Sequence, residues 1–126
     1  MTIFRFSLGA ILMAGPALAQ DFDVPSGMSV GLFDVILEQA MPTARFRFLA
    51  PDIQQESVGF ANVADDFQYL CDNVARPALA QNDWTEGDIV ISYSAAELPF
   101  GEIAPDVTQF FQPFRLTEDG CQWEDF

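Results

Sequence analysis

The sequence has 126 residues, half of them apolar and 13 of them Phe, which is enough to build the core of one domain. Its formal net charge is −14, and a surface this acidic repels nucleic acid and anionic lipid headgroups. It contains neither His nor Lys, which removes the commonest general base, the commonest transition-metal ligand and Schiff-base chemistry.

The first residues have the pattern of a secretory signal peptide. Arg5 supplies a positive start, an apolar run extends to Ala14, and a Gly-Pro break precedes an Ala-Leu-Ala cleavage site that ends at Ala19. The apolar run is shorter than the ~20 residues that a membrane-spanning helix needs. We therefore expect residues 1–19 to be cleaved and residues 20–126 to form a single mature domain, periplasmic or secreted and without a stable membrane anchor. An uncleaved amphipathic anchor or a buried N-terminal helix is the alternative.

Two strands are predicted next. Residues 29–38 are rich in Val, Leu, Ile and Phe, and residues 43–49 alternate between an apolar face and a face that carries Arg45 and Arg47. Because Pro42 separates them, we expect the two strands to form a hairpin.

A helix follows, and it gives the clearest periodic signal in the chain. Apolar residues recur at helical spacing in the set Val63, Phe67, Leu70, Cys71, Val74 and Ala78. Asn62 is the expected N-cap, and Pro77 should kink or end the helix near Arg76. This pattern places Cys71 on the buried stripe.

Three more strands complete the prediction. Residues 88–95 alternate, residues 107–116 form a strand that Pro113 restricts to an edge or a bulge, and residues 121–126 form a short last strand. The order β-β-α-β-β-β indicates the α+β class, with one helix packed on an antiparallel sheet of about five strands.

The two cysteines, Cys71 and Cys121, most simply form one disulfide in an exported chain. It would connect the buried stripe of the helix to the last strand. A redox pair or a thiol nucleophile is the alternative, but the spacing is not C-x-x-C and no His is present to act as a base.

The sequence offers no catalytic, cofactor-binding or metal-binding residue above background. Adjacent carboxylates occur at 65–66, 118–119 and 124–125, but neighbours on a helix or strand point in different directions and do not face one cleft. Residues 21–27 resemble a calcium loop only faintly, although scattered carboxylates could hold a hard cation. We therefore expect no cofactor.

An aromatic surface is the strongest candidate for a working site. The segment 98–114 carries Phe100, Phe110, Phe111 and Phe114, with apolar residues on both faces of the predicted strand, so that one set could bind a partner or an apolar ligand. The alternative is a sheet covered on both sides. Arg45 and Arg47 could grip an anion, although pairing with carboxylates of the chain itself is the expected outcome.

Several motifs resemble those of a family of short exported bacterial proteins of unknown function. They are Arg45-Phe46-Arg47-Phe48-Leu49-Ala50-Pro51, Leu70-Cys71, Val90-Ile91-Ser92, Pro99-Phe100-Gly101, Pro105, Thr108-Gln109-Phe110-Phe111, Phe114 and Cys121-x-Trp123-Glu124-x-Phe126. Some members carry an acetolactate synthase label. That activity needs thiamine diphosphate, and this sequence lacks the Gly-Asp-Gly that opens the motif binding that cofactor. The resemblance implies no catalytic residues.

The leading hypothesis is a small exported binding or accessory protein without catalysis, with an unknown protein or small molecule of the periplasm as its partner. A small carboxylate-based hydrolase or lyase, with or without a metal, is the alternative. A purely structural domain is the third reading.

Overall fold

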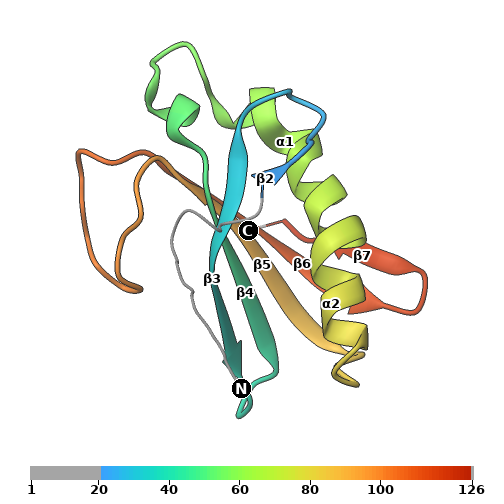
Figure 1. Ribbon diagram of the computed structural model, residues 1–126. Helices are drawn as coiled ribbons and strands as arrows, with labels where there is room; N and C mark the ends of the chain where they lie inside the picture. The colour runs from blue at the N-terminus through green and yellow to red at the C-terminus, as the bar shows by residue number, and fades with distance from the viewer. Residues whose placement is uncertain (1–20, 126) are drawn as a thin grey trace, which may run out of the picture.

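The computed structural model describes residues 21–125 (Figure 1). The predicted signal peptide, residues 1–19, lies outside the described residues. In the described part no helix is long and apolar enough to cross a membrane. The strands are β2 (Asp21–Phe22), β3 (Val30–Glu38), β4 (Thr43–Leu49), β5 (Gly87–Ser94), β6 (Gln109–Thr117) and β7 (Gly120–Trp123). The helical segments are η3 (Pro51–Gln54), α1 (Phe60–Leu70), η4 (Cys71–Ala75) and α2 (Arg76–Ala80).

The six strands form one sheet in the order β2-β3-β4-β5-β6-β7. The predicted hairpin is confirmed, since β3 and β4 pair antiparallel from Gly31 with Leu49 to Glu38 with Thr43. The α+β class with one helix is also confirmed. The sheet is not wholly antiparallel, however, because β4 and β5 run parallel. The helix between them brings the chain back to the starting end of β4, which is the usual connection for parallel neighbours.

The helix begins earlier than the sequence indicated. Gly59 is the N-cap, and α1 starts at Phe60. Asn62, the predicted cap, is the third residue of the helix, and its Oδ1 accepts the Gly59 N–H at 2.7 Å. This side chain still provides a hydrogen-bond acceptor at the start of the helix, but it does so from within the first turn and not from the N-cap position.

Pro77 does not end the helix at Arg76. The segment η4 is a π turn in which the Arg76 N–H donates to the Cys71 carbonyl, and α2 then carries Pro77 near its own start. The extra residue of a π turn accommodates a proline, which has no N–H for the helical ladder. It also moves the buried stripe by one position, so that Ala75 and Leu79 are buried where the sequence pattern indicated Val74 and Ala78.

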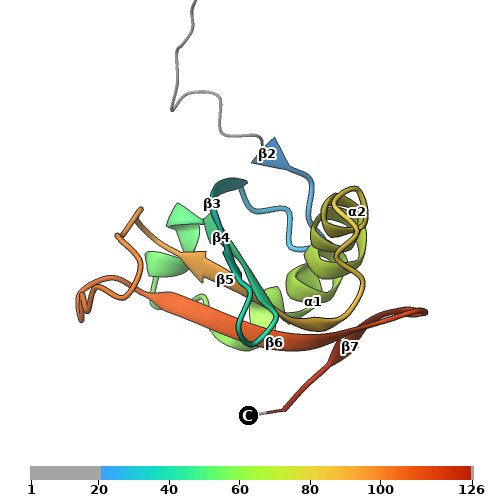
Figure 2. The ribbon, with the colours of Figure 1, turned by 90° about the horizontal axis from the view of Figure 1, so that it is seen from below.

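The sheet curls around the helix, and one face therefore holds the core (Figure 2). Alternate residues of β4, β5 and β6 point toward the helix, as the side-chain period of a strand requires. Those that are buried on this face include Ala44, Phe46, Phe48, Ile89, Ile91, Tyr93, Phe114 and Leu116. The helix contributes Val63, Phe67, Leu70 and Cys71, all fully buried.

The predicted disulfide between Cys71 and Cys121 is present. It joins η4 to β7, and two hydrogen bonds accompany it. The Cys121 N–H donates to Asp72 Oδ1 at 2.8 Å, and Gln68 Nε2 donates to the Cys121 carbonyl at 2.8 Å. The last strand is therefore attached to the helix by one covalent and two polar links.

Candidate functional site

The face of the sheet that turns away from the helix carries the candidate site. The long loop 95–108, between β5 and β6, lies on this side, opposite the helix in both ribbon views (Figures 1 and 2). Gln54 holds the far end of the loop, because its Nε2 donates to the Asp106 carbonyl at 2.9 Å and its Oε1 accepts the Thr108 N–H at 3.0 Å. At the near end, the Ser94 hydroxyl donates to the Ala96 carbonyl at 2.6 Å.

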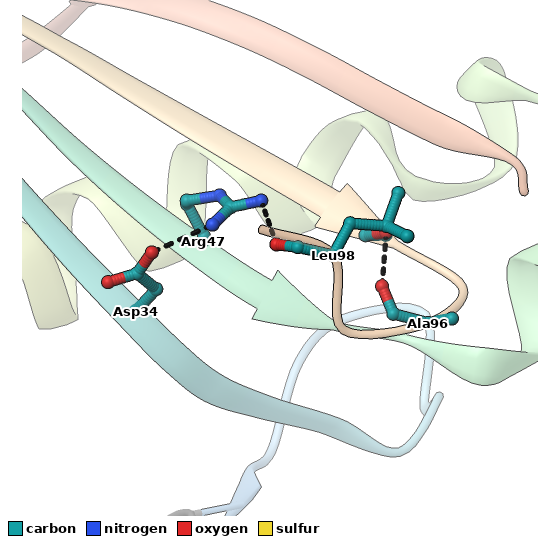
Figure 3. Close-up of polar contacts among 5 residues, drawn as sticks. Asp34, Arg47, Ala96 and Leu98 are labelled. Carbon is teal, nitrogen blue, oxygen red and sulfur yellow. Dashed lines mark hydrogen bonds and ion pairs between the residues drawn. The ribbon is translucent and has the colours of Figure 1, made fainter. Parts of the chain in front are cut away.

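Arg47 fixes the middle of this loop (Figure 3). Its side chain is only 10% exposed, and its guanidinium donates to Asp34 at 2.7 Å and to the Leu98 carbonyl at 2.7 Å. The same guanidinium carbon lies 4.9 Å from the ring centroid of Phe33 and 5.6 Å from that of Phe100. Arg47 therefore connects β3, β4 and the loop, and it gives the loop a defined position over the sheet.

Arg45 points to the same side but is more exposed. Its Nε donates to Glu38 at 2.8 Å, and its guanidinium carbon lies 5.4 Å from the ring centroid of Phe100. Each arginine is thus paired with a carboxylate of the chain itself, as expected for this pair of residues. Because Glu38 and Asp34 offset the two positive charges, this face is not built to grip an external anion.

The four Phe residues of the predicted surface lie in different surroundings. Phe100 is 55% exposed and Phe111 is 47% exposed, both on the helix-free side. Phe110 is half-buried against Phe60, with ring centroids 6.0 Å apart. Phe114 is fully buried on the helix side, so this residue belongs to the core and not to the surface.

A pocket of about 200 Å³ lies between the loop and the sheet, and we call it the Phe100 pocket. Phe100 and Phe111 form two of its walls. The other lining residues are Arg45, Arg47, Val90, Ser92, Pro99, Gly101, Glu102 and Gln109. Because sites for drug-sized ligands measure roughly 300–1,000 Å³, this pocket suits a single side chain or another small apolar group.

A second polar cluster lies in the core, at one of the adjacent carboxylates of the sequence. Asp66 is fully buried. Its carboxylate accepts the Ser26 N–H at 2.8 Å, the Ser26 hydroxyl at 2.6 Å and the Tyr93 hydroxyl at 2.9 Å. The cluster ties α1 to β5 and to the loop that precedes β3. Asp66 lies three residues after Val63 and four before Leu70, and this helical spacing is the signal that could have identified it as buried.

Burial raises the pKa of the Tyr93 phenol, and the negative charge and hydrogen bond of Asp66 raise it further. A phenol whose pKa is higher in the folded state stabilises the fold below its unfolded pKa of about 10 and loses that contribution as the pH rises. We therefore expect the protein to lose stability above about pH 10, and the Tyr93→Phe variant to lose less over the same range.

The loss of stability at alkaline pH can be followed through the ionisation of Tyr93 alone, because the chain has only one other Tyr residue, Tyr69. In a Tyr69→Phe variant, Tyr93 is the sole phenol, and its ionisation at 295 nm should coincide with unfolding followed by circular dichroism. Ionisation of Tyr93 at a pH where the fold is intact would contradict the buried Asp66–Tyr93 contact.

Two of the adjacent carboxylate pairs of the sequence do not direct both side chains into one buried site. Asp65 is exposed while Asp66 is buried, and Glu118 and Asp119 are both exposed. Within residues 21–125 no group of three or more His, Cys, Asp or Glu is placed to hold a metal ion.

Comparisons with known proteins agree with the resemblance of the motifs. No curated protein and no solved structure matches the chain. A family model does match, over residues 9–126, and its description is "Family of unknown function (DUF6497)". The matched range includes the strands, the helix, both cysteines and the aromatic loop. The chain therefore belongs to the DUF6497 family, whose function is unknown.

Proposed function

We propose that this protein is an exported accessory module that acts by binding, and that the Phe100 pocket receives an apolar side chain of a partner protein. The observation that carries the proposal is the exposure of Phe100 and Phe111, 55% and 47%, on two walls of one pocket. Exposed aromatic walls of this kind mark interaction sites, since aromatic residues are enriched where proteins meet.

The attachment of the loop supports this role. Arg47, Gln54 and Ser94 hold the loop 95–108 at three places through hydrogen bonds of 2.6–3.0 Å. A site on a preformed loop loses less conformational entropy when it binds than a site on a loose loop does. The pocket is therefore organised for binding before a partner arrives.

The proposed compartment is the periplasm or the extracellular medium. The N-terminal pattern that ends at Ala19 has the parts of an export signal. A structural disulfide is stable in such oxidising compartments and rare in the cytosol.

The test replaces the two exposed rings. Phe100→Ala and Phe111→Ala each remove an aromatic wall, and we expect each to abolish a stoichiometric partner complex seen by native mass spectrometry of protein purified gently from its own periplasm. Tyr69→Ala is the matched control, because Tyr69 is 39% exposed on the helix and lies outside the pocket.

The two variants should remain folded, since both rings are about half exposed, and the contacts of Phe100 with Arg45 and Arg47 are worth ~0.5–1 kcal/mol each at exposed sites. If the complex survives both substitutions, or if Tyr69→Ala disrupts it equally, the Phe100 pocket is not the binding site.

A further inference from the structure

The sheet has an open edge next to the Phe100 pocket. Within residues 21–125, the strand β7 pairs with β6 only from Phe114 to Thr117, and no other described strand lies beside the first part of β6 on that side. The last backbone link is the hydrogen bond from the Glu124 N–H to the Pro113 carbonyl at 3.2 Å. Beyond it lies the segment 109–112, which we call the β6 edge.

The register shows which backbone groups face outward at the β6 edge. The Pro113 carbonyl accepts the Glu124 N–H and therefore points away from β5. Because backbone groups alternate along a strand, the N–H and C=O groups of the other odd-numbered residues of β6 also point away from β5. Gln109 and Phe111 therefore present their N–H and C=O groups toward the open side, as alternation along an antiparallel strand requires. No strand of the described part of the chain pairs with these groups, and such a row of donors and acceptors is a template for pairing with another strand.

Apolar surface lies on both faces of the sheet at this edge. On the helix side a groove of about 460 Å³ is lined by Phe60, Phe110 and Trp123, together with the residues of the edge itself. On the other side lies the Phe100 pocket, and Phe111 lines both hollows. Because side chains of a strand alternate between the two faces, a strand added here would direct successive side chains toward the groove and toward the pocket.

The charge of the groove indicates which kind of partner it would bind. Glu124 and Asp125 line it, and none of its lining residues is basic, although Arg115 lies 3.7 Å from Glu124 in a surface ion pair that offsets part of the Glu124 charge. The whole chain carries a net charge of −14, so a second copy brought to the same edge would meet like charge. An extended segment with Lys or Arg beside apolar residues meets opposite charge and apolar surface together.

We propose that the β6 edge binds an extended, basic and apolar segment of a partner protein as an added strand of the sheet. This mode of recognition obtains affinity from main-chain hydrogen bonds and specificity from pockets for alternate side chains. The inference rests on the proposed binding function and specifies how the partner is held.

The test uses a synthetic peptide as the probe, acetyl-Lys-Val-Lys-Val-Lys-Val-Lys-amide, titrated into ¹⁵N-labelled protein at low salt. We expect the amide signals of Gln109 and Phe111 to shift most and their hydrogen exchange to slow. Two analogues of the peptide carry N-methyl groups on alternate residues, and in each analogue the methyl groups block hydrogen bonding along a different edge of the peptide strand. We expect the analogue methylated on the pairing edge to bind at least about tenfold more weakly, because two hydrogen bonds of ~1 kcal/mol each are lost.

Two controls test the charge and the site. A peptide with Glu in place of each Lys should not bind, and the double variant Glu124→Gln and Asp125→Asn should weaken binding of the Lys peptide about fivefold, since each rim charge contributes ~0.5 kcal/mol. Asp119→Asn is the matched control, because Asp119 is an exposed carboxylate that does not line the groove. It should leave the affinity unchanged.

The inference is overturned if the Lys peptide leaves Gln109 and Phe111 unshifted at millimolar concentration, or if neither methylated peptide is weakened. It is also overturned if the unliganded protein dimerises through the β6 edge, since the occupant is then a second copy. Failure of the peptide while Phe100→Ala still abolishes the native complex would remove this inference and leave the proposed function intact.

Discussion

Removal of the disulfide, in a Cys71→Ala and Cys121→Ala double variant, should lower the free energy of unfolding by about 4 kcal/mol. The two cysteines are 50 residues apart, and a cross-link of that length removes a large loop-closure entropy from the unfolded chain. Domains of this size have total stabilities of about 5–15 kcal/mol, so the variant should be near the limit of folding. Alanine is chosen because both sulfur sites are buried and would not accommodate a free hydroxyl.

Urea denaturation followed by tryptophan fluorescence measures this change. The wild-type protein unfolded in excess reductant is the control, and it should match the double variant. Gln68 and Asp72 still hydrogen-bond Cys121 backbone atoms without the disulfide, so β7 should remain attached in the fraction that folds. A loss of less than about 1 kcal/mol would show that the cross-link is dispensable.

Asp66→Ala should lower the free energy of unfolding by about 3–5 kcal/mol, since it leaves three donors without an acceptor in the core. The stranded donors are the Tyr93 hydroxyl and both the hydroxyl and the N–H of Ser26. Each unsatisfied buried donor costs ~1–3 kcal/mol, and water can reach Ser26 because this residue is only partly buried.

Asp65→Ala provides a matched control, because Asp65 is the adjacent carboxylate on the same helix and is exposed. Its effect should be within about 0.5 kcal/mol, as for most surface substitutions. Thermal and urea unfolding of the two variants side by side give the comparison. Equal losses in both variants would show that the helix start, and not the buried cluster, is what Asp66 stabilises.

Local patterns predicted the elements well where one face is buried and the other is not. The alternation around Arg45 and Arg47 identified the boundaries of β4, and the stripe through Val63 and Phe67 identified the helix. The partner of Cys71 followed from the presence of only two cysteines in the chain. These signals depend on spacing along the sequence, which a single chain displays directly.

The remaining features depend on contacts between distant segments. Sequence spacing could not show that β4 and β5 run parallel, because that pairing is decided by where the helix returns the chain. Pro77 was expected to kink or end the helix near Arg76, and the π turn that accommodates it instead has no sequence pattern of its own. The hydrogen bonds of Asp66 could not be predicted because their donors, Ser26 and Tyr93, lie 40 and 27 residues away.

The candidate site, like the fold, could be predicted from the sequence only in part. The segment 98–114 is aromatic in the sequence, yet only the folded sheet separates exposed Phe100 and Phe111 from buried Phe114. The role of Arg47 was also hidden, because its hydrogen bond to Leu98 spans 51 residues. A long-range contact of this kind places the loop over the sheet, where it becomes the wall of a pocket.

Site-specific photocrosslinking in the native host tests the binding account most directly. A benzophenone side chain would replace Phe100, Phe111 or, as the control on the helix, Tyr69. The account predicts one adduct of defined mass from Phe100 and Phe111 and none from Tyr69, because the partner contacts the helix-free face. No adduct at the two Phe positions, or the same adduct at all three, would contradict the claim that the protein acts by binding at this face.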